Sequence, residues 1–371
     1  MHRRLLLAAP ALLAVPARAQ GQVIETGRGP FRLTVLAEGL ERPWGGGFLP
    51  DGRLLVSERP GRARLIAPDG RVSAPLAGVP AVEPGGQGGL LDLQPAPDFA
   101  RTQEVFFAAS MLVQGGALTR LWRARLTAAG LADAAPVLDC TPAQSSGRLH
   151  YGGRLAFSPD GAHLFLTSGD RNVERARAQR LDDLAGKIIR LTRSGHVPAD
   201  NPFAGRAGAR GEIWSYGHRN PQGIAFHPVT GSLLAAEFGP RGGDELNLIQ
   251  PGRNYGWPEV THGREYWGGS IAGGRTAGPG FDAPLRQWTP SVSPSGIGVA
   301  PPRGPWRGDL FLACLNPAGL LRVEMVGDQP GAEERLLWGQ ARLRQVLFAP
   351  DGALLALTDE AAGRVLRLAP A

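Results

Sequence analysis

Polar residues suited to acid–base chemistry occur in short loops of this 371-residue chain. His150 stands just before an expected strand and is followed by Gly152 and Gly153. A histidine there could act as a general base, because its unperturbed pKa lies near neutrality. Asp170, in the segment TSGDR, could orient that imidazole and stabilise its protonated form. The structural alternatives stay open: a hydrogen-bonded core histidine and an aspartate that caps a turn.

Two arginines could bind an anion. Arg342 and Arg344 alternate with Leu343, so in a strand both guanidinium groups would point the same way. Such a pair suits a ligand with several carboxylates or phosphates. The alternative is a solvated strand face with an acidic neighbour, where an ion pair contributes little.

A turn at Gly239-Pro240 offers two backbone carbonyls with no bulky side chain. Hard cations such as calcium accept oxygen ligands of this kind. Glu245 and Tyr255 could add a carboxylate and a further backbone carbonyl to a cation site. Otherwise Glu245, beside Asp244, belongs to an ordinary acidic surface turn.

The chain carries six related units, and we expect these repeats to position the loops. Each unit reads as an apolar strand, a tight turn (typically Pro-Asp-Gly) and a second strand. Four copies are clear and two are degenerate, and their marker residues are Phe48, Leu93, Phe157, Phe226, Ala300 and Phe348. Units of this size with regular turns are typical of propeller blades. The sequence therefore predicts an all-β fold, a six-bladed β-propeller.

The polar loops are expected to follow the inner strands and to meet on one face, at the mouth of the central channel. The longer spacings between units predict loop insertions on one face. Ring closure is expected from pairing of residues 31–36 with residues 364–368. The residues expected at the common face are Gln87, His150, Asp170, Arg219, Asn220, Gly239, Pro240, Arg342 and Arg344.

The N-terminus reads as a secretory signal over residues 1–19, with a basic start, an apolar core and an Ala-Arg-Ala end. Residues 20–371 would then form a single propeller domain, exported most simply to a bacterial periplasm. No apolar run is long enough for a membrane span. Basic residues show no run with interleaved aromatics, which disfavours nucleic-acid binding. Cys140 and Cys314 are expected to be two buried free thiols rather than a disulfide.

The order of several motifs resembles the soluble PQQ-dependent aldose sugar dehydrogenases, also called the glucose/sorbosone dehydrogenase family. The matching motifs run from about Gly39 to about Leu368. They are GGQGGLL, H-x-GGRL-x-F, SYGHRNPQG, E-x-GP-x-GGDE-x-N, NYGWP, TPSVSPSG and R-x-R-x-V-x-x-x-PDG.

The resemblance implies a propeller that binds pyrroloquinoline quinone (PQQ) and calcium and oxidises aldoses to lactones. His150 would take the proton of the anomeric hydroxyl, Asp170 would support it, and Arg219 would stabilise charge on the reduced quinone. The other implied roles are cofactor contact by Gln87 and Asn220, carboxylate binding by Arg342 and Arg344, calcium binding by the carbonyls of Gly239 and Pro240, and a second, structural calcium site at Glu245 and Tyr255.

The chain departs from the family pattern at Asn316, a cofactor-binding position where some members carry a lysine. Leu149, just before the base, replaces a residue that is acidic in some members. Two other functions stay open: a metal-dependent propeller lactonase and a non-catalytic binding scaffold. The expected partners are a sugar and an external electron acceptor, and the expected assembly is a monomer or homodimer.

Overall fold

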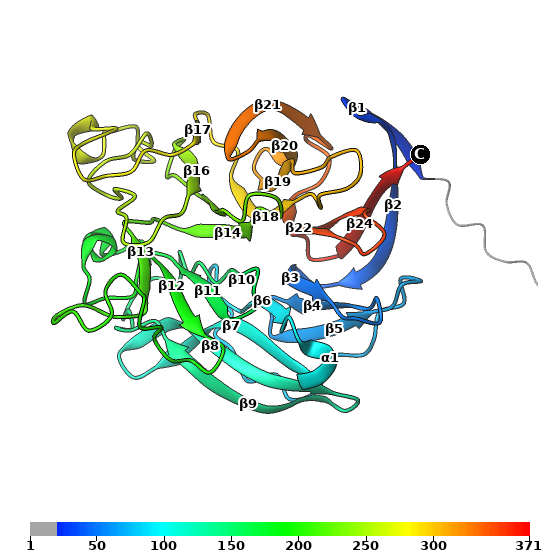
Figure 1. The fold of residues 1–371 in the computed structure, drawn as a ribbon, viewed down its shortest axis with the longest axis horizontal. Coiled ribbons are helices and arrows are strands. Elements are labelled where there is room, and N and C mark those ends of the chain that lie inside the picture. The colour runs from blue at the N-terminus through cyan, green and yellow to red at the C-terminus, as the bar shows by residue number, and fades with distance from the viewer. Residues whose placement is uncertain (1–20) are drawn as a thin grey trace, which may run out of the picture.

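The computed structural model describes residues 21–371, which form six separate antiparallel sheets around a common centre (Figure 1). The expected leader at residues 1–19 lies outside the described residues. Neighbouring sheets touch through their inner strands in a closed ring, in the order β3 (Pro43–Phe48), β6 (Leu90–Pro95), β10 (Leu155–Phe157), β14 (Pro221–Phe226), β18 (Pro294–Val299) and β22 (Leu343–Phe348). The six-bladed β-propeller that the repeats predict is confirmed.

Each blade grows outward from its inner strand. The second strands are β4 (Leu54–Glu58), β7 (Glu104–Val113), β11 (His163–Ser168), β15 (Leu233–Glu237), β19 (Leu310–Leu315) and β23 (Leu354–Thr358). The strands outside them are β5 (Arg62–Ile66), β8 (Gly116–Thr127), β9 (Gly130–Asp139), β12 (Lys187–Thr192), β13 (Ile213–Tyr216), β16 (Asp244–Leu248), β17 (Arg286–Trp288), β20 (Ala318–Val326), β21 (Gln329–Leu336) and β24 (Gly363–Pro370). Single helical turns lie at α1 (Phe99–Thr102), η1 (Arg175–Gln179) and η2 (Ala272–Gly274).

The marker phenylalanines pack one blade against the next. Phe157, at the end of β10, meets Phe106 of the preceding blade edge-on, with ring centroids 5.6 Å apart. Phe226 meets Phe165 in the same way at 5.4 Å, and Phe348 meets Phe311 at 5.7 Å. Edge-to-face aromatic pairs add stabilisation beyond their buried area. This repeated contact gives the repeated sequence pattern a physical cause.

The ring closes by pairing the two ends of the described chain. Strand β2 (Gly29–Leu40) pairs antiparallel with β24, with Leu33 opposite Leu368 and Val35 opposite Leu366. Strand β1 (Gln22–Thr26) then adds to the outside of β2. In Figure 1 these N-terminal strands lie beside the C-terminus. The predicted closure between residues 31–36 and 364–368 is confirmed.

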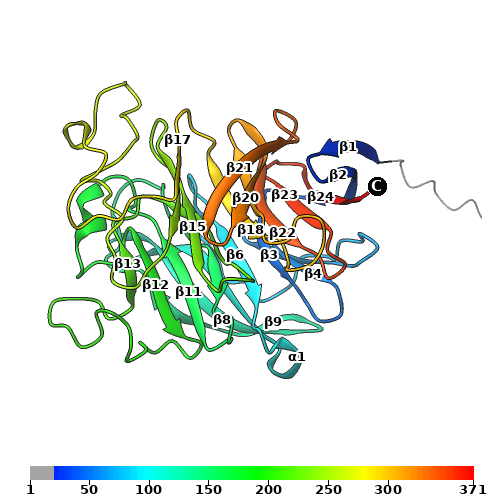
Figure 2. The same cartoon turned by 45° about the horizontal axis from the view of Figure 1, so that its top comes forward.

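The inserted loops lie on both faces, so their expected restriction to one face is wrong. Residues 169–186 join β11 to β12 at the end of the ring that holds Asp170. Residues 193–212 join β12 to β13 at the opposite end, because Thr192 pairs with His163, which follows a tight turn. Figure 2 shows this green loop and the yellow loop between β16 and β17 at opposite edges of the molecule. Each face of the ring therefore carries its own insertion.

The two cysteines are buried and free, as expected. No helix within residues 21–371 combines the length and the apolar character needed to cross a lipid bilayer.

Candidate active site

A cleft of about 1130 Å³ opens at one end of the ring. It lies where the inner strands begin, so most of the polar loops precede these strands and the expectation that they follow them is wrong. The expected convergence on one face is nevertheless correct. The predicted residues that line the cleft are Gln87, His150, Arg219, Asn220, Gly239, Pro240, Asn316, Arg342 and Arg344.

His150 and Asp170 form a buried hydrogen-bonded pair at the cleft wall. The imidazole Nδ1 lies 2.7 Å from Asp170 Oδ1. The second carboxylate oxygen accepts a hydrogen bond from the indole of Trp257 at 2.7 Å. Of the histidines in residues 21–371, His150 alone lines the cleft. The partnership that the sequence suggested is therefore present in the structure.

The environment of this pair favours a neutral imidazole and an ionised carboxylate. Burial lowers the pKa of His150, and the hydrogen bond to Asp170 only partly opposes it. Burial also raises the pKa of Asp170, but the hydrogen bond from His150, together with the Arg219 charge and the Asn172 amide, outweighs that effect and leaves the pKa lowered. An ionised Asp170 requires the proton on Nδ1 of the neutral ring. The Nε2 atom is then the free acceptor, which is the state a general base needs.

The backbone at His150 is strained, with φ at 50°. A residue with a side chain in this left-handed region costs about 1–3 kcal/mol and persists only where its surroundings impose it. The His150 amide donates to Gln87 Oε1 at 2.9 Å. The carbonyl of the preceding Leu149 accepts a hydrogen bond from Arg171 Nε at 3.0 Å. Gln87, which the resemblance predicts as a cofactor contact, holds the backbone of His150 in this structure.

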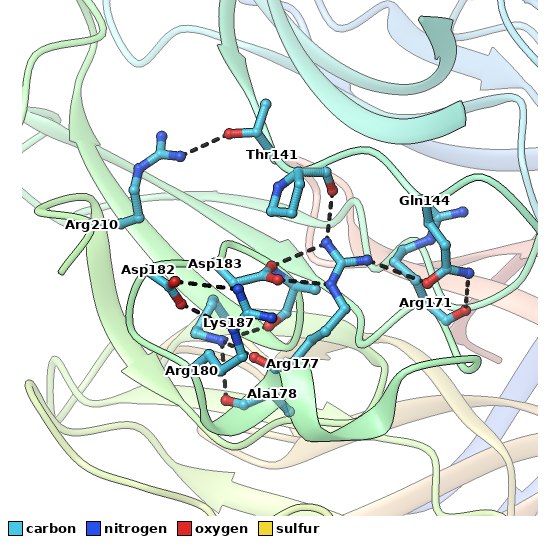
Figure 3. A network of polar contacts seen from close by, with 12 residues as sticks. Thr141, Gln144, Arg171, Arg177, Ala178, Arg180, Asp182, Asp183, Lys187 and Arg210 are labelled. Atoms are coloured by element: carbon cyan, nitrogen blue, oxygen red, sulfur yellow. Dashed lines mark hydrogen bonds and ion pairs between the residues drawn. The ribbon is translucent and has the colours of Figure 1, made fainter. Parts of the chain in front are cut away.

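A polar network underlies the loop that carries Asp170 (Figure 3). Arg177 forms an ion pair with Asp183, with Nε 2.8 Å from Oδ2, and donates to Gln144 at 3.3 Å. Lys187, the single lysine of the chain, is buried and donates to three backbone carbonyls of the same loop. Burial lowers its pKa to about 7. This network fixes the loop between β11 and β12 without contributing a side chain to the cleft.

Arg219 and Asn220 form the next part of the wall, just before β14. The Arg219 guanidinium donates to the carbonyls of Phe238 and Gly239 at 3.1 and 3.0 Å. Its backbone amide donates to Glu237 at 2.7 Å. The Asn220 side-chain oxygen accepts a hydrogen bond from the Gly152 amide at 3.2 Å and so ties this loop to the one that holds His150.

Four arginines line another part of the cleft, which is called the arginine wall: Arg42, Arg59, Arg342 and Arg344. Arg342 Nε and Arg344 Nη2 both contact Oδ2 of Asp359, at 2.8 and 2.9 Å. The predicted shared direction of the two arginines is confirmed, and the acidic neighbour of the structural alternative is also present. Burial tends to raise the pKa of Asp359, but the two guanidinium groups outweigh it and lower the pKa to about 2. Arg42 and Arg59 line the same cleft.

The channel beneath the cleft is filled by Arg154, which the sequence analysis missed. This arginine is 1% exposed and its guanidinium carbon lies 3.9 Å from the centre of the Trp44 ring. It donates to the carbonyl of Gln222 at 2.8 Å and lies 3.5 Å from Asp92. The repeat offset does not reveal it, because Trp44, Gln222 and Arg344 each stand four residues before a marker phenylalanine, whereas Arg154 stands three before Phe157.

The expected cation ligands fall into two places. Gly239 and Pro240 line the main cleft. Glu245 and Tyr255 instead line a second, smaller cavity of about 10 Å³, which Gly239, Arg219 and Glu237 also line. Burial and the charge of Glu237 raise the pKa of Glu245 to about 8. A cavity of this size holds about one water molecule or ion.

Known proteins match this chain over most of its length. The glucose/sorbosone dehydrogenase family model matches residues 40–367. The aldose sugar dehydrogenase YliI of Escherichia coli K12 is 38% identical, with all of both chains covered. A crystal structure of a glucose dehydrogenase has a TM-score of 0.88 and 44% identity, covering 91% of this chain and 99% of its own. The PQQ-bound aldose sugar dehydrogenase of Streptomyces coelicolor has a TM-score of 0.75 and 33% identity, covering 91% of this chain and 98% of its own. The chain therefore belongs to the glucose/sorbosone dehydrogenase family.

Proposed function

We propose that this protein is a PQQ-dependent aldose sugar dehydrogenase that oxidises the anomeric hydroxyl of an aldose to a lactone. The observation that carries the proposal is the composition of the cleft. A buried histidine–aspartate pair forms one wall and an arginine cluster forms another, so a proton acceptor and an anion receptor share one space. Relatives named as sugar dehydrogenases, one of them PQQ-bound, support this reading.

The arginine wall fits the charge of PQQ, which carries three carboxylates. Arg342 and Arg344 share one carboxylate, Asp359. Arg42 and Arg59 make no side-chain hydrogen bond or ion pair within residues 21–371. The buried Nε of Arg344 likewise has no partner in this part of the chain. Guanidinium groups bind carboxylates in well-defined, often bidentate geometry, so a polycarboxylate would satisfy this surplus of donors.

PQQ, when bound, supplies a two-electron acceptor for the hydride that leaves the sugar carbon. The protein supplies the proton chemistry: His150 Nε2 accepts the hydroxyl proton, and the Asp170 carboxylate stabilises the imidazolium that results. Arg219, whose guanidinium lies at the same wall, stabilises negative charge that develops in the cleft. Asn220 and Gln87 position the two loops around the base.

Calcium fits the carbonyl oxygens of Gly239 and Pro240, which line the cleft. The Gly239 oxygen also accepts a hydrogen bond from Arg219, while no hydrogen bond reaches the Pro240 oxygen within the described residues. Calcium takes about six to eight oxygen ligands, so two carbonyls form only part of its shell. We infer that calcium binding here depends on oxygens from the cofactor or from water.

A second calcium fits the small cavity at Glu245 and Tyr255. The side-chain oxygen of Asn247, two residues after Glu245, is buried without a partner in residues 21–371, while its amide nitrogen donates to Glu245 at 3.2 Å. The Tyr255 hydroxyl is occupied by the Leu248 carbonyl, which leaves its backbone carbonyl for a cation. An acceptor-rich cavity with a carboxylate of raised pKa favours a cation that displaces the proton.

The lactonase alternative would place a metal ion at the channel centre. Arg154 occupies that position, and its positive charge opposes a divalent cation there. The scaffold alternative is disfavoured by the intact histidine–aspartate pair, since a binding surface needs no such base. We further propose export through the leader at residues 1–19 and electron transfer to an external acceptor.

Reconstitution tests the proposal. The purified apoprotein would be incubated with PQQ, calcium or both, and dye reduction would be followed with a panel of aldoses. The proposal expects sugar-dependent reduction that requires both additions. Failure to bind PQQ, or PQQ binding with no activity towards any aldose, would contradict it.

A further inference from the structure

Arg171 is a buried cation next to the proposed base, His150. The proposed chemistry gives Arg171 no role. It follows Asp170 directly, is 4% exposed and forms no ion pair with a carboxylate among residues 21–371. Its contacts are instead neutral: Nε donates to the Leu149 carbonyl at 3.0 Å and Nη1 to the Ala117 carbonyl at 2.8 Å. Its guanidinium carbon lies 3.7 Å from the centre of the Tyr151 ring. A buried charge without a counter-ion is costly, so this arrangement needs a reason.

The contacts of Arg171 bracket the base. Leu149 and Tyr151 are the chain neighbours of His150 on either side, and Arg171 holds the carbonyl of one and the ring of the other. Between them His150 adopts its strained left-handed backbone. Ala117, the third contact, lies in strand β8 of the preceding blade. The guanidinium therefore links the base to a rigid element of the propeller.

Arg171 is itself held in place by the network of Figure 3. Its carbonyl accepts a hydrogen bond from Gln144 Nε2 at 2.8 Å. Gln144 in turn accepts one from Arg177, which is paired with Asp183. Gln144 is also joined through its backbone to Ala117, the residue that Arg171 contacts. The side chain and the backbone of Arg171 are thus anchored at the same strand.

We propose that Arg171 is a positioning residue for the base: its guanidinium holds the Leu149 carbonyl on one side of His150 and the Tyr151 ring on the other, and so directs the imidazole Nε2 into the cleft. This inference rests on the proposed function, because it assigns His150 as the proton acceptor. A reaction whose base is misplaced by about 1 Å can be roughly a hundredfold slower. Holding His150 in place can therefore offset the cost of burying the unpaired Arg171 charge.

The charge of Arg171 acts in the same direction as its contacts with Leu149 and Tyr151. The charged groups that influence the imidazole are Asp170, Arg171 and Arg219, which come from two different loops. Both arginines lower the pKa of His150, against the effect of Asp170. Arg171 therefore helps to keep the base unprotonated near neutral pH.

The test compares Arg171→Met and Arg171→Lys with the wild type. Arg180→Met is the matched control, because Arg180 lies on the same loop, is exposed and pairs only with Asp182. Three measurements are made: PQQ affinity by absorbance titration, the pH profile of kcat, and the titration of the His150 ring by NMR in histidine-labelled apoprotein. The His150 resonance is assigned by its loss in His150→Gln.

For Arg171→Met we expect unchanged PQQ affinity, a fall in kcat of roughly ten- to a hundredfold, and a His150 pKa above that of the wild type. Arg171→Lys should keep the positive charge but lose the planar guanidinium that donates to Leu149 and Ala117 together. We therefore expect kcat to fall while the His150 pKa stays low. Arg180→Met should match the wild type in all three. Wild-type kcat and pKa in Arg171→Met would overturn the inference.

Two further outcomes are decisive. Should Arg171→Met fail to fold, Arg171→Lys decides, and wild-type kcat in that variant would overturn the positioning role. Should the wild type oxidise no aldose, the proposed function fails, while NMR still tests the placement of His150. An identical His150 resonance in wild type and Arg171→Lys would then overturn this inference on its own.

Discussion

The two walls of the cleft differ in how far the protein satisfies them by itself. On the base wall, the part of the cleft that holds His150 and Asp170, the two side chains have internal partners: His150 contacts Asp170, and Asp170 accepts from Trp257. On the arginine wall, Arg342 and Arg344 share a single carboxylate oxygen. Preorganised groups lower a barrier because they need no rearrangement during the reaction. The base wall has this property before any ligand binds.

The arginine wall instead carries more positive charge than its acidic residues balance. Arg42 and Arg59 add to it, and Asp359 is its one acidic lining residue. Like charges held together in a partly buried cleft repel one another, and an anionic ligand removes that repulsion. Under the proposed function the two walls have different roles: one would accept the proton, and the other would bind the anion. Variants of each wall should therefore affect different measurements.

The largest effect is expected from His150→Ala. Removing the proton acceptor should lower kcat by about a hundredfold to ten-thousandfold, while PQQ affinity stays near that of the wild type. Single-turnover reduction by an aldose and PQQ titration measure the two quantities separately. His196→Ala, at an exposed histidine, is the control. Near-normal turnover in His150→Ala would show that another group takes the proton.

The arginine wall should respond in the opposite way. Arg342→Ala with Arg344→Ala would leave Asp359 as an unpaired buried charge, which itself destabilises the fold. The pair is therefore made in the Asp359→Asn background and compared with Asp359→Asn alone. We expect PQQ to bind about a hundredfold more weakly, measured by equilibrium titration, with a somewhat lower melting temperature because Arg344 also donates to the buried Gln222 and Ser295. Equal affinity of the two proteins would place the cofactor carboxylates elsewhere.

The pH dependence should reveal the state of the base. The pKa of His150 is lowered from 6.5, so the imidazole stays neutral until the pH falls below that value. We expect kcat/KM to be level through neutrality and to fall about tenfold per pH unit only on the acid side of 6.5. Initial rates over a pH series on the holoprotein measure this. An acid limb that begins above pH 6.5 would contradict a burial-lowered base.

Asn316→Lys should have the smallest effect. Asn316 is exposed and lines the cleft, where a lysine would add one more cation. Exposed charge pairs contribute about 0.2–1 kcal/mol, so PQQ affinity should rise by a few-fold at most. Asn316→Gln, which keeps the amide, is the control. A gain of several orders of magnitude would mean that the arginine wall is not the principal anion receptor.

The fold was predictable because the repeated residues make the same packing contact in several blades. In three of the four clear copies the phenylalanine at the end of the inner strand meets an aromatic ring of the neighbouring blade, and a tight turn follows it. The site was predictable where motifs flank inner strands, as at His150 and Arg344. Asp359, Trp257 and Arg154 were not, because their roles depend on contacts between distant segments. Trp257, for example, reaches Asp170 across 87 positions of sequence.

The central claim is that an aldose delivers its hydride and proton within this cleft. Stopped-flow mixing of the PQQ- and calcium-loaded protein with an aldose and its C1-deuterated form tests this without any external acceptor. We expect the absorbance of the oxidised cofactor to disappear on mixing, and to do so several-fold more slowly with the deuterated sugar. No absorbance change in protein shown to hold stoichiometric PQQ, with any aldose of the panel, would contradict the account.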